Sequence, residues 1–332
     1  MEDSVSLCHY TPFYSFLEGG IKTSVKQQKK ALKKADMDFA ESLRDDFRIL
    51  HLNYFDPLSI AAFFKTRYFS GKKVVFHSHV TGEDFKDSMR FSNLVAPLVG
   101  AFTLFFYRRA DKVIAPSEYT KGLLKEKNVE DIEVVSNGID TERLQETGTP
   151  VEELEEKYQD SDFTAIQLGL VFERKGLTDF IETAEKMPET DFTWFGPSMN
   201  KVLSRTGTRR KMKTSPSNVK FPGFIEDIND AFKLADVFFF PTHEENQGIS
   251  LLEAAYKGLP IVVRDIGTYD GWLEHEKHCL KADDPEGFKE QIQRLKQNPE
   301  LREKIGENAR QMAEQHTLDK IGEKLKKVYE KV

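Results

Sequence analysis

The sequence has few cysteines and no apolar segment long enough to span a bilayer. Only Cys8 and Cys279 occur among 332 residues, far apart in the chain. They cannot build a disulfide framework or a cysteine-rich zinc site, and they fit a reducing cytoplasm. The longest apolar stretch, residues 94–107, contains Pro97 and Gly100 and is too short to cross a membrane. A run of this length is often a core helix.

Other signals are absent as well. The acidic start, residues 1–4, lacks the charged region and apolar core of a signal peptide. There is no internal repeat, and no G-x-G-x-x-G with a following acidic residue lies near the first expected strand, which argues against a dehydrogenase. With a mean hydropathy of -0.52, the sequence indicates a cytoplasmic globular chain.

Charge is unevenly distributed. The net charge is -7, but residues 1–150 carry 21 basic and 21 acidic side chains, so the excess lies in the remainder. Residues 21–110 carry 16 basic against 9 acidic side chains. A basic region of this kind can attract a phosphate-rich surface, either lipid headgroups or nucleic acid. The alternative is a solvated lysine-rich helix around residues 22–34.

Short apolar runs alternate with longer amphipathic segments, which is typical of βα units around parallel sheets. A polar, acidic segment at 147–160 contains Gly148 and Pro150 and predicts a change of domain there. Residues 299–332 have helical periodicity. The expected buried strands are 48–52, 73–77, 112–115, 132–135, 164–168, 192–195, 219–221, 237–240 and 261–263.

Two glutamates flank a glycine turn after the expected strand 237–240. Gly248 should open a helix that ends at Gly258, so the backbone N–H groups of Gly248, Ile249 and Ser250 form an anion site. Glu245 precedes the turn and Glu253 follows it. Since a carboxylate can accept hydrogen bonds from two vicinal hydroxyls, the pattern suits a diphosphate with sugars on both sides. The spacing alone also fits a solvated acidic pair.

A cationic segment follows the expected strand 164–168. Residues 169–176 begin at Gly169 and end with Arg174, Lys175 and Gly176 ahead of an amphipathic helix. Adjacent cations at a strand end can neutralise a diphosphate leaving group as its negative charge develops. Two exposed surface charges are the alternative interpretation.

Together these segments resemble glycosyltransferase family 4. The family's acidic motif reads roughly E-G-F-G-x-x-x-x-E-A, then G-x-P, and here Asn246 and Gln247 replace the usual Gly-Phe. The family also has G-x-x-x-x-R-K-G at the position of residues 169–176. The resemblance implies an α/β chain of the GT-B fold, two Rossmann-like domains with parallel sheets facing across a cleft. It places an acceptor domain at 1–150, a nucleotide-sugar domain at 151–310 and a helix at 311–332 that packs back on the first domain.

The resemblance also implies roles. Glu245 would contact hydroxyls of the transferred sugar and Glu253 the ribose, while Arg174 and Lys175 bind the phosphates. Gly169 and the amides of Gly248, Ile249 and Ser250 would complete the donor site. No metal and no protein nucleophile are implied, and the anomeric configuration would be retained by front-face displacement.

The N-terminal half offers further candidates. Glu18, Gly19 and Gly20 precede a helix and could approach donor or acceptor, although most Gly-Gly pairs are simple turns. His77 and His79 end a strand, where a metal would need a third ligand that is not evident. By analogy with the family we favour His79 as a residue that hydrogen-bonds the sugar or helps the acceptor lose its proton. A structural histidine is the alternative.

Two short motifs are assigned no catalytic role. The D-x-D at 36–38 matches the metal signature of the other large glycosyltransferase fold but lies at the end of a helical stretch, so we reject it as a metal site. The N-G-I-D at 137–140 resembles a family turn with a structural role.

Longer stretches narrow the resemblance. Residues 77–98, 169–196 and 244–273 are similar to the bacterial monoglucosyldiacylglycerol synthases. That subgroup implies UDP-glucose as donor, no required cofactor, a diacylglycerol-like acceptor and peripheral contact with an anionic membrane at the inner face of the cell. Residues 94–107 with Arg108 and Arg109 could supply that contact, and no nucleic-acid partner is expected. Two alternatives stay open: a soluble or polyprenyl-linked glycan acceptor, and a nucleotide-sugar-binding protein without turnover.

Overall fold

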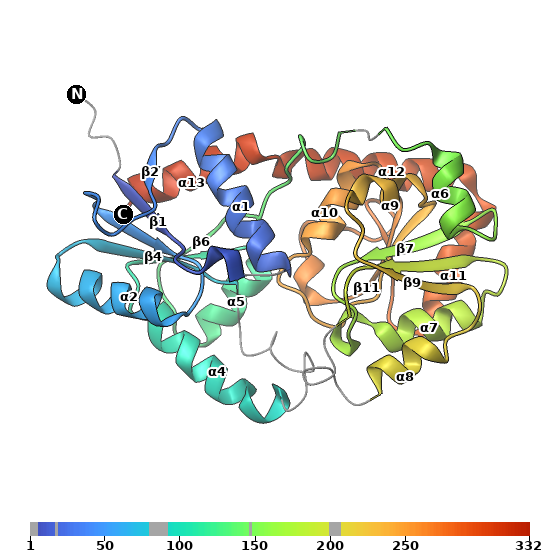
Figure 1. The fold of residues 1–332 in the computed structure, drawn as a ribbon, viewed down its shortest axis with the longest axis horizontal. Helices are drawn as coiled ribbons and strands as arrows, with labels where there is room; N and C mark the ends of the chain where they lie inside the picture. The colour runs from blue at the N-terminus through green and yellow to red at the C-terminus, as the bar shows by residue number, and fades with distance from the viewer. Residues whose placement is uncertain (1–5, 17–18, 80–91, 146–147, 199–206) are drawn as a thin grey trace. The chain divides into compact units, whose positions relative to one another are not determined.

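The computed structural model describes residues 6–16, 19–79, 92–145, 148–198 and 207–332. The chain forms two compact units that divide between Ile139 and Asp140, and His316–Val332 rejoins the first unit. This division falls ahead of the change of domain expected at 150. In its described part each unit has one six-stranded parallel sheet with helices packed against it (Figure 1).

The sheet of the first unit has the order β2-β1-β3-β4-β5-β6. Alternate residues of its central strands lie in different core clusters: Leu50 and Val74 belong to one, Ile49 and Val75 to the other. Because both faces are buried, these strands are mostly apolar, and His51 and His77 are buried polar exceptions. The elements are β1 (Leu7–Tyr10), α1 (Gly19–Lys34), β2 (Phe39–Ala40), β3 (Ile49–Leu52), α2 (Pro57–Phe69), β4 (Lys73–His77), α4 (Ser92–Tyr107), β5 (Lys112–Ala115), α5 (Glu118–Glu126), β6 (Ile132–Val134) and α13 (Leu318–Glu330), with the 3-10 helix η1 (Tyr14–Phe16).

Local sequence explains several helix starts. The Asp56 carboxylate caps α2 by accepting from the backbone N–H groups of Leu58 and Ser59, and Pro57 occupies the first helical position, where its missing N–H costs nothing. Ser117 caps α5 in the same way, through the N–H of Thr120.

The C-terminal tail, expected to be helical over 299–332, forms two helices. The 3-10 turn η4 (Glu314–His316) separates α12 (Pro299–Ala313) from α13. Only α13 packs in the first unit, where it lies against α1. The two helices approach so closely at Gly322 that a Cβ there would overlap the Ala31 carbonyl oxygen.

The second unit has the sheet order β12-β11-β10-β7-β8-β9. Its core cluster joins Phe180 of α7 and Phe239 of β10, whose rings stack with centroids 5.6 Å apart. The elements are α6 (Val151–Tyr158), β7 (Thr164–Leu168), η2 (Glu173–Lys175), α7 (Leu177–Glu185), β8 (Asp191–Phe195), α8 (Thr208–Lys213), β9 (Val219–Gly223), α9 (Ile228–Lys233), β10 (Val237–Phe240), α10 (Ile249–Tyr256), β11 (Ile261–Arg264), η3 (Gly267–Tyr269), β12 (Leu280–Ala282), α11 (Pro285–Gln297) and α12.

Both sheets reverse their strand order at one point. In the second unit the chain builds β7, β8 and β9 outward and then returns to place β10 on the other side of β7. Ligands of such sheets bind beyond the carboxyl ends of the two strands at the reversal. The segments that follow β7 and β10 are those that carry Arg174-Lys175 and Glu245–Glu253. The strand reversal and the sequence motifs therefore indicate the same edge of the sheet, beyond the carboxyl ends of β7 and β10.

Candidate functional site

The segments after β7 and β10 are packed tightly together. Gly176, with φ of +85°, lies against Pro241, and a Cβ on Gly176 would overlap the Pro241 carbonyl oxygen. The backbone N–H of His243 donates to the Arg174 carbonyl at 2.8 Å. A glycine is required after Arg174-Lys175 because both its conformation and the space exclude a side chain.

Lys175 and Glu245 form an ion pair in this packed region. Both side chains are largely buried, and the Lys175 ammonium also lies 5.1 Å from the centre of the Phe240 ring. Burial by itself would raise the pKa of Glu245, but the positive charges of Lys175 and Arg174 outweigh it and lower that pKa. Glu245 is therefore ionised at neutral pH, and the predicted sugar-binding carboxylate lies beside the predicted phosphate-binding cations.

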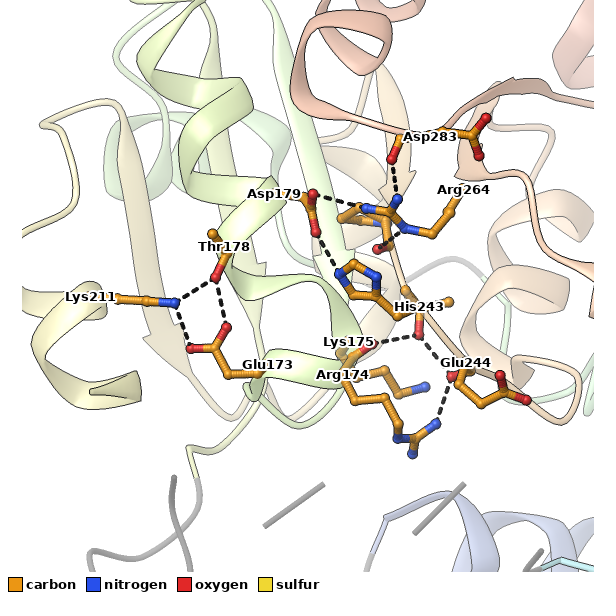
Figure 2. Close-up of polar contacts among 12 residues, drawn as sticks. Glu173, Arg174, Lys175, Thr178, Asp179, Lys211, His243, Glu244, Arg264 and Asp283 are labelled. Atoms are coloured by element: carbon orange, nitrogen blue, oxygen red, sulfur yellow. Dashed lines mark hydrogen bonds and ion pairs between the residues drawn. The ribbon is translucent and has the colours of Figure 1, made fainter. Parts of the chain in front are cut away.

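Arg174 is held by the opposite segment. Its guanidinium donates to the Glu244 carbonyl at 2.6 Å, and it lies 5.3 Å from the Phe172 ring centre (Figure 2). The Thr242 hydroxyl donates to the carbonyls of Arg174 and Glu244 at 3.3 and 3.0 Å. Both segments therefore fix the direction of this cation.

Asp179, near the start of α7, contacts side chains of the neighbouring segments (Figure 2). Its carboxylate contacts the His243 ring at 2.7 Å and forms an ion pair with Arg264 at 2.9 Å. Arg264 also donates to the carbonyls of Pro241 and Asp283. Although burial tends to raise the pKa of Asp179, His243 and Arg264 together lower it. No sequence pattern singled out this network, because its members lie on three different segments.

The start of α10 is the place where the sequence predicts an anion site. Gly248, with φ of +88°, precedes the helix, and the Ser250 hydroxyl donates to the Leu168 carbonyl at the end of β7, at 3.2 Å. Gly169 continues from Leu168, and its carbonyl accepts from the Trp194 indole at 2.9 Å. The N-terminal amides of α10, including that of Ile249, thus lie next to the residues that follow β7.

Glu253 lies on α10 with 4% of its side chain exposed. Arg143 donates to one of its carboxylate oxygens at 2.7 Å. Burial raises the pKa of Glu253 to about 7, with Arg143 opposing the shift and Asp140 adding to it. The pKa values of the two glutamates of the motif therefore shift in opposite directions. Arg143 contacts one of these glutamates, and the sequence did not indicate it.

In the first unit His77 and His79 belong to a larger cluster with His9 and His51. The rings of His77 and His79 stack with centroids 4.4 Å apart, and His77 stacks on His51 at 5.8 Å. Asn53 contacts His79 at 2.9 Å, and Gln28 contacts His9 at 3.0 Å.

Burial dominates the chemistry of this cluster. It lowers the pKa of His79 to about 3 and that of His9 to about 4, and it takes the pKa values of His51 and His77 well below their usual value. All four rings are therefore neutral at physiological pH, which favours hydrogen bonding by His79 over action as a strong base. Within the described ranges no group of three or more His, Cys, Asp or Glu side chains could hold a metal ion.

The other N-terminal candidates occupy helix ends. Gly19 and Gly20 are the first residues of α1 and are exposed, whereas Glu18 lies outside the described residues. Asp36 follows the end of α1 in a left-handed conformation, with φ of 50°. This agrees with a helix terminus at the D-x-D sequence.

An apolar surface covers α4 and the end of α2 in the first unit. Only one face of α4 is core, with Ala96 and Phe106 buried, while Leu94 and Leu98 are 77% and 71% exposed. We call the exposed set the α2–α4 apolar face, and it consists of Phe64, Tyr68, Phe69, Leu94, Leu98, Phe102 and Phe105. Ring contacts of Phe64 with Tyr68 and Phe105 join its two helices. No helix in the described part of the chain is long and apolar enough to cross a membrane.

Family models match both units of the chain. The model for glycosyl transferases group 1 matches residues 151–312, and the model for glycosyltransferase family 4 matches residues 19–143. The matches contain the Arg174-Lys175 segment, the Glu245–Glu253 motif, His77 and His79.

Similar proteins support the assignment. The chain is 33% identical to the processive diacylglycerol alpha-glucosyltransferase of Acholeplasma laidlawii, over 95% of this chain and 94% of that protein. It is 26% identical to the alpha-galactosylglucosyldiacylglycerol synthase of Streptococcus pneumoniae, over 90% and 83% of the two chains. Among solved structures, Anabaena Alr3699/HepE in complex with UDP-glucose matches with a TM-score of 0.78 and 15% identity, covering 98% of this chain and all of the other. The chain belongs to the family 4 glycosyltransferases of the GT-B fold and is a hexosyltransferase.

Proposed function

We propose that the chain transfers glucose from UDP-glucose to a lipid hydroxyl, with retention of the anomeric configuration, at a membrane surface. The observation that carries the donor half is the Arg174-Lys175 segment packed on the Glu245–Glu253 motif at the strand reversal of the second unit. The Acholeplasma relative is named a diacylglycerol glucosyltransferase, which supports a diacylglycerol-like acceptor.

Each donor residue has a role that its surroundings support. Arg174 and Lys175 neutralise the diphosphate as the bond to the sugar breaks, together with the amides at the start of α10. The Glu245 carboxylate, kept ionised by the same cations, accepts from hydroxyls of the sugar. Glu253 accepts from the ribose. The cations act where a divalent metal acts in other transferases, and no metal is part of the proposed mechanism.

The chemistry of the proposed donor and the name of a relative support retention. UDP-glucose is α-linked, and the relative's name describes an alpha-glucosyltransferase. A front-face displacement needs no protein nucleophile, because the leaving diphosphate itself helps to remove the proton of the incoming hydroxyl. His79 is proposed to hydrogen-bond the sugar as a neutral ring, and Gly19, Gly20 and His77 are proposed to serve the acceptor.

The donor assignment is tested by Arg174→Ala and Glu245→Gln, measured by UDP release with UDP-glucose and diacylglycerol in mixed vesicles. Each variant should lose about 100-fold or more in kcat, the magnitude typical of one removed charge-stabilising group. The matched controls are Arg294→Ala and Glu274→Gln, which change exposed ion pairs elsewhere in the same unit and should keep wild-type rates. Wild-type turnover by both site variants would overturn the site assignment.

The lipid acceptor draws support from the α2–α4 apolar face. Basic side chains border it: the Arg109 guanidinium lies 3.9 Å from the centre of the Phe105 ring, and Arg67 donates to the Arg109 carbonyl at 2.8 Å. Apolar side chains with adjacent cations are the pattern of a surface that enters the interface of an anionic bilayer. A hexosyltransferase bound in this way meets its acceptor without leaving the membrane.

Flotation with vesicles of phosphatidylglycerol and phosphatidylcholine tests this surface. Leu98→Glu and Phe69→Glu should each reduce bound protein at least tenfold, because a carboxylate opposes both apolar insertion and the anionic surface. Phe224→Glu is the matched control, since Phe224 is 76% exposed in the other unit. Equal binding by all variants would contradict the membrane proposal.

Transfer to a soluble or polyprenyl-linked glycan, with none to diacylglycerol, would favour the alternative acceptor. UDP-glucose binding without any transfer would favour a binding protein.

A further inference from the structure

The pair formed by Arg143 and Glu253 contains a nearly buried carboxylate and a partly exposed guanidinium. The Glu253 side chain is 4% exposed and that of Arg143 is 38% exposed, with 2.7 Å between the joined atoms. Arg143 donates to one carboxylate oxygen, Oε1. Among the described residues, the other oxygen of Glu253 accepts no hydrogen bond. The second oxygen of this nearly buried carboxylate is thus available to accept a hydrogen bond from a ligand.

The backbone around Arg143 is fixed to the second unit. The Asn229 amide donates to the Arg143 carbonyl at 2.8 Å, and the backbone N–H of Arg143 donates to the Asp140 carbonyl at 3.1 Å. Lys257 donates to the next carbonyl, that of Leu144, at 3.3 Å. The guanidinium therefore reaches Glu253 from an anchored turn.

We propose that Arg143 is a positioning residue for the donor: it holds the Glu253 carboxylate by one oxygen and presents the other to the ribose hydroxyls of the nucleotide. This inference rests on the proposed donor role of Glu253. It makes recognition of an intact ribose depend on a residue outside both sequence motifs. A hydrogen bond to an ionised acceptor is shorter and stronger than one to a neutral acceptor, so the charge of Glu253 decides the strength of the contact.

The local charges support this role. Burial favours the protonated form of Glu253 and raises its pKa to about 7, while Arg143 favours the ionised form. Asp140 acts in the opposite sense to Arg143. The elements packed on α10 contribute little else: β10 carries only apolar side chains, Arg264 of β11 is paired with Asp179, and Arg310 of α12 is paired with Glu307.

Calorimetric titration of the full chain with UDP and with 2′,3′-dideoxy-UDP tests the proposal. Both ligands carry the same diphosphate, so the ratio of their Kd values isolates the ribose contact from phosphate ionisation. For the wild type at pH 8 the dideoxy ligand should bind about 10- to 100-fold more weakly, the range expected for hydrogen bonds to a charged group. The ratio should fall as the pH is lowered through about 7, because protonated Glu253 accepts more weakly.

Arg143→Ala should reduce the ratio at pH 8 to less than about threefold, because without the guanidinium the pKa of Glu253 rises further and the carboxylate loses its orientation. Arg143→Lys restores the charge but not the fixed geometry and should recover part of the ratio and the wild-type pH dependence. Arg294→Ala, which removes an exposed pair of the same length, is the control for folding and should keep the wild-type ratio.

The outcomes separate the two claims. A wild-type ratio and pH dependence in Arg143→Ala overturn the role of Arg143 while UDP binding upholds the donor site. The proposal is supported if the wild type discriminates between the two ligands and Arg143→Ala does not. Failure of the wild type to bind UDP at all overturns both this inference and the proposed function. If Arg143→Ala does not fold, Arg143→Lys decides the question: a ratio below that of the wild type supports the proposal, and a full wild-type ratio refutes it.

Discussion

Glu245 and Glu253 belong to one motif, yet their surroundings shift their pKa values in opposite directions. Both are buried, but Glu245 has two cations beside it, whereas Glu253 has one cation and a nearby aspartate. The first carboxylate is ionised throughout the neutral range, and the second changes charge within it. Partner geometry rather than residue type therefore sets the chemistry of each position.

Asp179 is predicted to stabilise the segments that carry the candidate site residues. Asp179→Ala leaves Arg264, whose side chain is 11% exposed, without its carboxylate partner. We expect a loss of about 1–3 kcal/mol in the free energy of unfolding, the cost of an unpaired buried polar group. We also expect a several-fold higher KM for UDP-glucose, because the segment carrying Glu245 loses its support. Urea denaturation and donor titration measure the two effects.

The control for Asp179 is Glu286→Ala, which removes an exposed carboxylate paired with Lys186 and Lys289. This change should stay within about 0.5 kcal/mol of wild type. Equal effects of the two variants would contradict the supporting role of Asp179.

The sequence predicted those site residues that stand in local patterns. Arg174-Lys175 and Glu245–Glu253 each lie in one short segment next to a strand, so their resemblance to the family motifs was enough to select them. Arg143 and Asp179 were not predicted, because their partners Glu253 and Arg264 lie far along the chain. Only the folded arrangement brings them together. The assigned roles of all these residues remain proposals.

At the scale of elements, the ends of β1, β3 and β4 bring four histidines together in a buried cluster. Each has a lowered pKa, so folding disfavours their protonated forms. Their contribution to stability is fully present above the unfolded pKa of 6.5 and is lost as the pH falls from there toward about 4. The first unit should therefore lose stability steeply in mild acid.

His77→Leu tests this dependence. Neither ring nitrogen of His77 has a hydrogen-bond partner among the described residues, so the substitution removes a titrating group without breaking a bond. Between pH 6.5 and 5 the variant should lose less stability per pH unit than the wild type, by a difference that rises toward about 1.4 kcal/mol, the value for one proton. Urea denaturation at several pH values measures the slope, and an unchanged slope would argue against burial as the cause.

The elements themselves were largely predictable. All nine expected strands are present, because a strand buried on both faces is a continuous apolar run. The missed strands are β1, β2 and β12, and they are short or interrupted by polar residues: β1 contains His9 and β12 contains Lys281. The break between α12 and α13 was missed because no glycine or proline marks it.

At the scale of the whole molecule, each unit combines a six-stranded parallel sheet with one group of candidate residues at the strand reversal. The proposed donor residues belong to the second unit, whereas the histidine cluster and the α2–α4 apolar face belong to the first. Substitutions in different units should therefore test the proposed donor site and the proposed membrane contact separately.

The central claim is that the segments after β7 and β10 hold a UDP-sugar, and hydrogen exchange measured by mass spectrometry tests it most directly. UDP-glucose should slow exchange in peptides covering residues 169–176 and 243–253, and Glu245→Gln should weaken that protection. Peptides around Phe224 and Arg294, away from these segments in the sequence, should exchange at the same rate with and without the donor. Protection elsewhere, with none in the two segments, would contradict the account.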